Sequence, residues 1–450
     1  MATATRGSRQ GRQLEVRYRP ISELKLNLQN PRIHTKQQLR QIAESVRSFG
    51  FNTPVLIDGK GNVIAGHGRV LAAPLAGITE VPTVSLEHLT AAQARAFMLA
   101  DNRLAQLATW NDRLLAENLK ALSEVEINFS LEATGFQMGE IDVLIEGLAP
   151  ATKGEADPAD LLPRQAKRQV SRAGDIWTLG RHRVYCGDAR ERSAYRAVMD
   201  NKRAAMVLTD PPFNVPIDGY ASGFGAVHHK EFQMACGEMN EAEFERFLTQ
   251  VMDLLAAHSV DGALHLLFMD QHHVYEITSA AKQVYAELKG VCVWDKAVGG
   301  QGSLYRSQHE LVFVYKKGRS SHTNNVQLGK HGRYRSNVWK YPRPSSFGRA
   351  SEEGYLAELH PTVKPVALMA DAILDCSKRG DIVLDAFLGS GTTLIAAERT
   401  GRICYGLEID PVYIDTTIRR WQTFAGQQAI HANSRRTFRE VEEELHEHKR

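Results

Sequence analysis

Short apolar runs alternate with helical patterns through the second half of the chain. Amphipathic patterns at 241–258 and 364–379 predict helices. Runs rich in β-branched and other apolar residues, separated by helices, are typical of a mostly parallel sheet with helices on both faces. The predicted strands are 183–187, 205–210, 263–270, 290–296, 310–317, 381–387 and 403–410. Only a glycine-rich connection joins 290–296 to 310–317, so this pair is expected to form an antiparallel edge hairpin. The pattern predicts an α/β fold.

The remaining segments differ from this domain in composition and periodicity. Residues 14–148 mix short strands with helical periodicity, which predicts a smaller α+β domain with a helical extension. Residues 149–173 are rich in proline and mixed charge, as linkers are. We expect the large α/β domain at 174–425 and a charged helical tail at 426–450.

Composition limits the class of protein. A length of 450 residues favours two or more domains. The net charge of +3 is too small to indicate a class of partner, so only local clusters of charge are informative. The five cysteines are scattered without a CxxC pair, which favours neither a zinc site nor a disulfide framework and suits a reducing cytosol. No apolar run reaches the roughly 18 residues of a membrane span, and the N-terminus lacks the apolar core of a secretory signal. We expect a cytoplasmic protein with no membrane partner.

Motifs at three strand ends indicate a ligand site, because open α/β sheets bind ligands beyond the carboxyl ends of their strands. In 384-LDAFLGSGTT-393 a strand leads into a glycine-rich turn that lacks the lysine of a phosphate-binding NTPase loop. Glu408 follows one strand later, at a spacing suited to ribose hydroxyls, and Asp188 ends another strand. Each acid alone could equally be a surface or capping residue, but together they favour a cofactor that carries a nucleoside.

A rigid corner ends a fourth strand, in 207-VLTDPPFNV-215. Proline fixes φ and cannot continue a sheet ladder, so the backbone leaves the sheet in one stiff direction. Taken alone, Asp210 could be a turn residue. It could also be a carboxylate held, with the ring of Phe213, around a substrate.

These motifs resemble the permuted, beta-type amino-group DNA methyltransferases over about 174–425. In that family the target-base motif precedes the cofactor loop, as DPPF at 210–213 precedes 385–393 here. The stretch 360-HPTVKPVALM-369 resembles the segment before that loop, and 187-GD-188 resembles the adenine-contacting acid. The resemblance implies a Rossmann-like fold and S-adenosylmethionine as cofactor. Its implied cofactor residues are Asp188, Asp385, Phe387, Gly389, Ser390, Gly391, Thr392, Thr393, Glu408 and Asp410, with Thr362 and Lys364 equally suited to a helix N-terminus.

Methylation of an exocyclic amine needs hydrogen-bond acceptors, because the amine's lone pair is delocalised into the base. The resemblance assigns this role to the Asp210 carboxylate and the Pro211 carbonyl, held rigid by Pro212, with Phe213 stacked on a flipped base. In the family, Asp at the first position is typical of adenine-N6 enzymes and Ser of many cytosine-N4 enzymes, so adenine is favoured. The alternatives are a cytosine-N4 enzyme, a ParB-like DNA-binding protein with an inactive methylase domain, and a small-molecule or protein-amide methyltransferase.

A basic, aromatic insert is the expected contact with double-stranded DNA. Residues 316–349 contain nine Lys or Arg and no Asp or Glu, interleaved with four aromatic residues. In the family this interval commonly holds target recognition, here 316–358, whereas a charge run alone is usually a solvated face. The predicted DNA contacts are Lys330, Arg333, Arg335, Trp339, Lys340 and Arg343. The glycine-rich loop 214–232 is a candidate to close over the flipped base.

The N-terminal segment resembles the ParB/sulfiredoxin-like family. The resemblance rests on 30-NPR-32, Gly50-Phe51 before Pro54, 66-GHGRVLAA-73 and 101-DNR-103. It implies a helix N-terminus that can bind nucleotide phosphate, and it leaves room for a homodimer. The implied nucleotide contacts are Gly66, Gly68, Arg69, Asn102 and Arg103. A module that only docks DNA or a partner is the alternative, because His67 replaces an acid and Pro74 enters the helix early. No acidic cluster predicts a metal site or cleavage.

Overall fold

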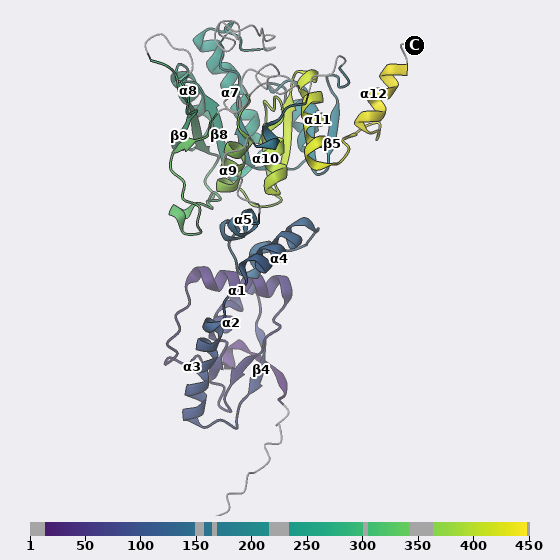
Figure 1. Cartoon of the computed structure of the whole chain (residues 1–450). Helices are drawn as coiled ribbons and strands as arrows, with labels where there is room; N and C mark the ends of the chain where they lie inside the picture. Colours follow the sequence, from purple (N-terminus) through teal and green to yellow (C-terminus); the bar gives the residue numbers. More distant parts are fainter. Residues whose placement is uncertain are drawn as a thin grey trace, which may run out of the picture. The chain divides into compact units, whose positions relative to one another are not determined.

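The computed structural model describes residues 14–148, 157–163, 169–215, 234–299, 305–342 and 363–447. The chain forms two compact units, Met1–Leu148 and Ala149–Arg450 (Figure 1). Each unit has its own sheet and its own apolar core, so each is described by itself.

The C-terminal unit is built on one sheet in the order β11-β9-β10-β8-β7-β12-β13-β6-β5-β14. Strands β8, β7, β12, β13 and β6 are parallel, which confirms the predicted Rossmann-like α/β sheet. The strands are β5 (Ile176–Leu179), β6 (His182–Cys186), β7 (Ala204–Thr209), β8 (Ser259–Met269), β9 (Glu287–Asp295), β10 (His309–Lys316), β11 (Val338–Lys340), β12 (Ile382–Asp385), β13 (Ile403–Glu408) and β14 (Ile430–His431).

The predicted hairpin is correct in its pairing and wrong in its position. Strands β9 and β10 pair antiparallel, as expected. However, β11 pairs with β9 on its outer side, in parallel, so β9 is not the edge. Strand β11 has only three residues and lies in the basic insert, so no apolar run in the sequence predicts it.

Helices cover both faces of this sheet (Figure 1). Side chains of β7 alternate between the layers: Met206 and Leu208 belong to one apolar cluster and Val207 to the other. The first cluster takes residues from α9, α10 and α11, and the second from α6, α7 and α8. The helices are α6 (Arg192–Met199), α7 (Glu241–Ala257), α8 (Val274–Val284), α9 (Val366–Cys376), α10 (Thr392–Thr400), α11 (Pro411–Ala425) and α12 (Phe438–Glu447).

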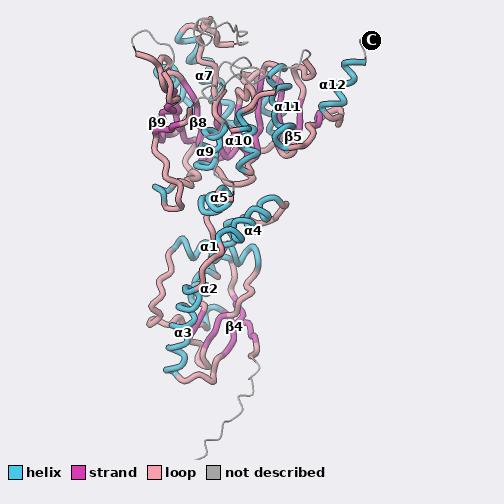
Figure 2. The backbone as a smooth tube through the Cα atoms, viewed as in Figure 1, coloured by secondary structure: helices cyan, strands magenta, loops and turns pink. Residues whose placement is uncertain are grey.

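The N-terminal unit is the predicted smaller α+β domain (Figure 2). Its sheet has the order β1-β4-β2-β3, and Val55, Ile57, Val63 and Val81 are buried in its core. Helices α4 and α5 form a separate apolar cluster with Leu131. The elements are β1 (Val16–Pro20), α1 (Lys36–Phe49), β2 (Val55–Ile57), β3 (Val63–Ala65), α2 (His67–Ala72), β4 (Glu80–Ser85), α3 (Ala91–Leu107), α4 (Asp112–Glu124) and α5 (Met138–Glu146).

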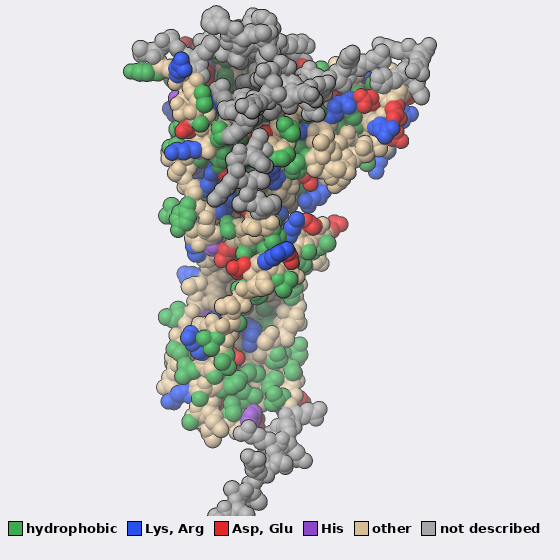
Figure 3. Space-filling model, in the orientation of Figure 1, with side chains coloured by type: hydrophobic (Ala, Val, Ile, Leu, Met, Phe, Trp, Pro, Cys, Tyr) green, Lys and Arg blue, Asp and Glu red, His purple; other side chains and the backbone are tan. Residues whose placement is uncertain are grey.

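Helix α3 is the least covered helix of the N-terminal unit. Met98 is its one buried side chain, whereas Leu104 and Leu107 are more than half exposed. Hydrophobic side chains accordingly appear on the visible surface of this unit (Figure 3).

The described parts of the predicted linker are fixed to the C-terminal unit. Asp157 pairs with the Arg399 guanidinium through two hydrogen bonds of 2.6 and 2.7 Å, and Asp160 accepts from the Val366 amide at 2.8 Å. The amides of Val170 and Ser171 donate to the carboxylate of Asp415. These residues therefore belong to the surface of helices α9 to α11. Within the described residues, no helix is long and apolar enough to cross a membrane.

The C-terminal tail docks through Phe438 and through an ion pair of 2.8 Å between Glu442 and Arg419. Phe438 of α12 is 1% exposed, and its ring centroid lies 5.3 Å from that of Trp177 in β5. The Arg419 guanidinium lies 4.8 Å from the Phe438 centroid on the other side. The tail is therefore part of the packed core beside β5 and β14.

Phe438→Ala should lower the free energy of unfolding of the C-terminal unit by about 3–5 kcal/mol, because it empties a buried aromatic site. Phe424→Ala is the matched control, since Phe424 on α11 is 39% exposed and should cost much less. Chemical denaturation followed by circular dichroism measures both. Equal, small losses would contradict the docked position of α12.

Candidate active site

Acidic side chains end four neighbouring strands of the sheet. In the order β7-β12-β13-β6, Asp210 follows β7, Asp385 and Glu408 end β12 and β13, and Asp188 follows β6. These strands are parallel, so their carboxyl ends meet at one edge of the sheet. This is the edge at which open α/β sheets bind ligands. The fold thus brings together the acids that the sequence analysis selected one by one.

Asp210 has one carboxylate oxygen engaged and one open. Its Oδ2 accepts a 2.5 Å hydrogen bond from Lys364 Nζ. Its Oδ1 is buried and has no hydrogen-bond partner among the described residues. Burial raises the pKa of Asp210 to about 6, although the Lys364 ammonium opposes that rise. Next to it, Pro211 is buried, and the partly buried ring of Phe213 packs against both apolar clusters.

Lys364 belongs to a chain of buried charges rather than to the cofactor loop. Its Nζ also lies 3.0 Å from Glu310 Oε2, and Glu310 Oε1 lies 2.5 Å from Lys296 Nζ. No motif in the sequence predicts Glu310 and Lys296 as site residues. The feature that could have indicated a functional role for Glu310 is its place as an acid at the start of an otherwise apolar buried strand. Thr362, the companion of Lys364 in the prediction, lies outside the described residues.

Asp385 ties the glycine loop to the end of β7. Its carboxylate accepts from Thr209 Oγ1 at 2.7 Å, Thr393 Oγ1 at 2.6 Å and the Phe387 amide at 3.0 Å. The side chain is almost fully buried. The hydroxyls of Thr209 and Thr393 each donate to one of its oxygens, so Asp385 holds the loop in place, and its contact with the cofactor stays a prediction.

The glycine loop packs tightly under its own backbone. Gly391 has φ +83°, and a Cβ there would lie 2.7 Å from Thr417 Cγ2, so a side chain is excluded. Ser390 and Thr392 are buried, and the Ser390 carbonyl and the Thr392 hydroxyl accept from the Arg420 guanidinium at 3.1 Å each. Hence Ser390, Thr392 and Thr393 shape the loop through their buried contacts, while Gly389 and Phe387 remain partly exposed.

Glu408 joins the glycine loop to β13. Its Oε2 accepts from the Gly389 amide and its Oε1 from the Asp410 amide, both at 2.8 Å. Burial raises the pKa of Glu408 to about 7 against these two hydrogen bonds. Asp410 itself caps α11, because its carboxylate accepts from the Val412 amide at 2.9 Å. A carboxylate oxygen has more than one lone pair, so Glu408 can still accept from a ligand.

Asp188 lies beside Glu408 but is paired within the chain. The Gly187 amide donates to the Glu408 carbonyl at 2.9 Å, which joins the ends of β6 and β13. The Asp188 carboxylate accepts from the Arg190 guanidinium at 2.6 Å. Burial disfavours the charged form, but the hydrogen bonds from Arg190 outweigh it and lower the pKa of Asp188.

The basic insert divides into buried and exposed parts. Arg333, 7% exposed, pairs with Asp371 and Asp375 of α9 at 3.0 Å each, and Arg335 pairs with Asp375 at 2.9 Å. Trp339 is buried below the Arg335 guanidinium. The two arginines hold the insert against α9, and contact of these three side chains with DNA stays a prediction. Lys330 and Lys340 are exposed, and Arg343 lies outside the described residues.

Motifs of the N-terminal unit meet around its 30-NPR-32 segment. Arg32 donates to Asn102 Oδ1 at 3.0 Å, and a Cβ on Gly68 would lie 2.8 Å from His34 Cε1. Gly66 adopts φ +101°, and Arg69 donates to the Pro54 carbonyl at 3.3 Å. Arg103 is exposed. Helix α2 has only six residues and is followed by Pro74, so its N-terminus offers little dipole to a phosphate.

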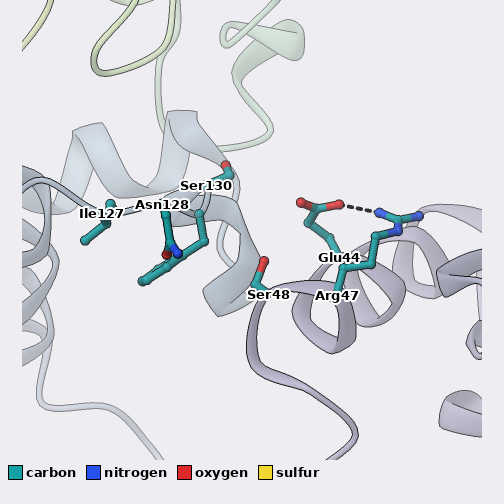
Figure 4. Close-up of a pocket in the computed structure, with 7 residues that line it drawn as sticks. Glu44, Arg47, Ser48, Ile127, Asn128 and Ser130 are labelled. Carbon is teal, nitrogen blue, oxygen red and sulfur yellow. Dashed lines mark hydrogen bonds and ion pairs between the residues drawn. The ribbon is translucent and has the colours of Figure 1, made fainter.

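A hollow of about 550 Å³ lies elsewhere in this unit, between α1 and residues 127–130 (Figure 4). Glu44 and Arg47 line it and are paired with each other, and Arg47 also donates to the Leu75 carbonyl. None of the predicted nucleotide contacts lines this hollow.

Three segments of the chain match known families. Residues 204–419 match the N6/N4 methyltransferase family, described as DNA methylase. Residues 6–103 match the ParB N-terminal domain, and residues 113–173 match the ParB-methyltransferase HTH domain. The chain therefore contains an N6/N4 DNA methylase domain and a ParB-like N-terminal domain.

Two sequence relatives and one solved structure are similar to parts of this chain. The ParB-like nuclease domain-containing protein YnaK of Escherichia coli is 47% identical over 77 residues, covering 17% of this chain and 88% of YnaK. The type II methyltransferase M2.MboI of Moraxella bovis is 23% identical over 227 residues, 48% of this chain and 80% of that protein. A putative DNA modification methylase of Thermus thermophilus, solved with S-adenosyl-L-methionine, is 20% identical with a TM-score of 0.37, covering 54% of this chain and 94% of its own.

The family match confirms the prediction of a DNA methyltransferase. It includes enzymes for both exocyclic amines, N6 and N4. The HTH match was not foreseen: it covers α4, α5 and the segment that the proline and charge pattern predicted as a linker. The helical periodicity around Leu119 and Ile141 was the available signal.

Thr393→Val should lower the free energy of unfolding by about 1–3 kcal/mol, because it leaves Asp385 Oδ2 buried without its donor. Thr423→Val on α11 is the matched control, since its hydroxyl bonds an exposed helix carbonyl. Thermal unfolding measures both. If the two variants were equally stable, Asp385 would not be the link between loop and strand.

Proposed function

We propose that this DNA methyltransferase acts on the N6 amino group of adenine in double-stranded DNA. The observation that carries the proposal is Asp210, a strand-end carboxylate with 20% of its side chain exposed, whose buried Oδ1 lacks a partner among the described residues. An acceptor left open in a dry site is what an amine donor needs. Asp210 also stands two strands from Glu408, in the order β7-β12-β13.

The residues present fit S-adenosylmethionine. Glu408 would accept hydrogen bonds from the ribose hydroxyls, and the side-chain-free Gly389 and Gly391 would let the methionine portion approach the backbone. Asp188 would lie near the adenine ring, with Phe387 at the mouth of the loop. When bound, the cofactor supplies an electrophilic methyl group on a positively charged sulfur.

Asp210 and its neighbours prepare the amine. With a pKa of about 6 the Asp210 carboxylate is ionised at neutral pH, so Oδ1 accepts one N–H of the amine. The Pro211 carbonyl would accept the other, drawing the lone pair out of the ring. The two prolines keep both acceptors in place without reorganisation, and Phe213 would stack on the flipped base.

The choice of adenine rests on the acid at position 210, since Asp there is typical of the adenine-N6 members. A cytosine-N4 enzyme remains the alternative within the family. An inactive scaffold is disfavoured, because Asp210, Glu408 and the glycine loop are all intact and face one edge of the sheet.

On the DNA side, exposed Lys330 and Lys340 would contact phosphates, with the ParB-like and HTH segments as additional docking elements. A homodimer and a nucleotide at Gly66–Arg69 stay predictions. A role in restriction and modification is proposed from the likeness to M2.MboI.

The base identity is tested by incubating the purified chain with unmethylated DNA and S-adenosylmethionine and analysing nucleosides by mass spectrometry. N6-methyladenine is expected. Asp210→Asn should lower the transfer rate by about 100-fold or more, because it removes the negative charge and an acceptor. Asp270→Asn is the control with unchanged transfer, because Asp270 is a strand-end acid that already accepts from the His272 and His273 amides. N4-methylcytosine, or full activity of Asp210→Asn, would contradict the proposal.

The proposed contact of Glu408 with the ribose predicts that cofactor binding changes the protonation of Glu408. Its pKa of about 7 leaves it partly protonated near neutral pH, and ribose hydroxyls that donate to the carboxylate would lower that pKa. Cofactor binding should therefore release protons between about pH 6 and 7.5, measured by titration calorimetry in buffers of different ionisation enthalpy. Glu408→Gln should bind more weakly and lose this release. Equal proton release in both proteins would disprove the assignment.

A further inference from the structure

We infer that Lys364 and Glu310 are positioning residues for methyl transfer: a buried chain of alternating charges, Lys296–Glu310–Lys364–Asp210, fixes the charge and the orientation of Asp210. The inference rests on the proposed function, because it concerns how the acceptor for the target amine is prepared. It adds Lys296 and Glu310, which no motif of the sequence identified.

The chain of charges joins four separate segments. Lys296 follows β9, Glu310 lies in β10, Lys364 precedes α9 and Asp210 follows β7. The contacts are 2.5 Å from Lys296 Nζ to Glu310 Oε1, 3.0 Å from Glu310 Oε2 to Lys364 Nζ, and 2.5 Å from Lys364 Nζ to Asp210 Oδ2. Side-chain exposures are 7%, 10%, 5% and 20% along that order. Two positive and two negative groups are thus held together at one end of the sheet.

Stability does not explain such an arrangement. Removing an ion from water costs several kcal/mol, and apolar side chains of similar volume often replace buried ion pairs without loss. Buried, mutually perturbed charges are instead frequent at functional sites. Here one end of the chain is the carboxylate of the DPPF corner, so the function to consider is the control of Asp210.

Aromatic rings fix the ammonium of Lys364. Its Nζ lies 5.0 Å from the ring centroid of Phe268, 5.6 Å from that of Trp294 and 5.8 Å from that of Phe213. Rings at this range attract a cation and exclude water, so the charge acts on Asp210 through a low-dielectric interior. Since Lys364 holds Oδ2, the carboxylate cannot rotate freely, and Oδ1 stays the open acceptor.

The groups around Asp210 act in opposite directions on its charge. Burial, Glu310 on β10 and Asp385 on β12 disfavour the carboxylate, whereas Lys364 favours it. Lys296 acts through Glu310 from the end of β9. Removing Lys364 should therefore raise the pKa of Asp210, and neutralising Glu310 should lower it.

The test is the single-turnover methylation rate as a function of pH. The ionised Asp210 carboxylate is a stronger acceptor for the amine than the protonated acid, so the wild-type rate should rise with pH through about 6. Lys364→Met should move this rise to higher pH by about 1–3 units. The near-isosteric Glu310→Gln should move it to lower pH. Lys289→Met is the control, because Lys289 pairs with Glu287 away from the site and should not move it.

Binding of cofactor and thermal unfolding of each variant show whether the fold is kept. Opposite shifts support the inference, because loss of structure alone would not move the pH profile in two directions. Shifts in the same direction, or unshifted profiles in folded variants of an active enzyme, overturn this inference alone. A wild-type chain that methylates no DNA overturns the proposed function and this inference together.

Discussion

The site depends on satisfying several carboxylates that lie side by side in a dry environment at one end of a parallel sheet. A buried carboxylate without partners is costly, so each needs donors from the chain. Asp385 has two threonine hydroxyls, Glu408 has two backbone amides, and Asp188 has Arg190. Among these four strand-end acids, only Asp210 leaves an oxygen without a partner in the described residues. That difference separates the group that is poised for a substrate from the groups that hold the site together.

The same hydrogen bonds connect the site to the fold. Thr209 is the last residue of β7, and its hydroxyl reaches Asp385 at the end of β12, so the acceptor corner and the glycine loop are joined directly. The Arg420 guanidinium of α11 donates to the Ser390 carbonyl of the loop and also to the Ala159 carbonyl at 2.8 Å. The loop, the anchored 157–163 segment and α11 therefore form one packed unit. A loop fixed in this way needs little reorganisation when it binds a ligand.

Local patterns in the sequence were enough for the central strands and for the acids at their ends. Apolar runs such as 205–210 and 403–410 predict strands without information from the rest of the chain. The carboxyl ends of parallel strands lie at one edge of the sheet, which brings the acids at those ends together. The short strands β5, β11 and β14 were not predicted, because they have two to four residues and lie outside the longer apolar runs. The sequence predicts Arg333 and Arg335 only as DNA contacts, because their acidic partners, Asp371 and Asp375, lie about 40 residues further along the chain. Charge counting within a segment cannot detect such pairs, and for the same reason it missed Glu310 with Lys364.

The most direct test of the central claim is a structure of the protein with a DNA duplex and a non-reactive analogue of S-adenosylmethionine. The account predicts an adenine turned out of the duplex, its amine within hydrogen-bond distance of Asp210 Oδ1 and the Pro211 carbonyl, with Lys364 still bound to Oδ2. A target base whose amine meets other groups, or an Asp210 that turns away from it, would contradict the account.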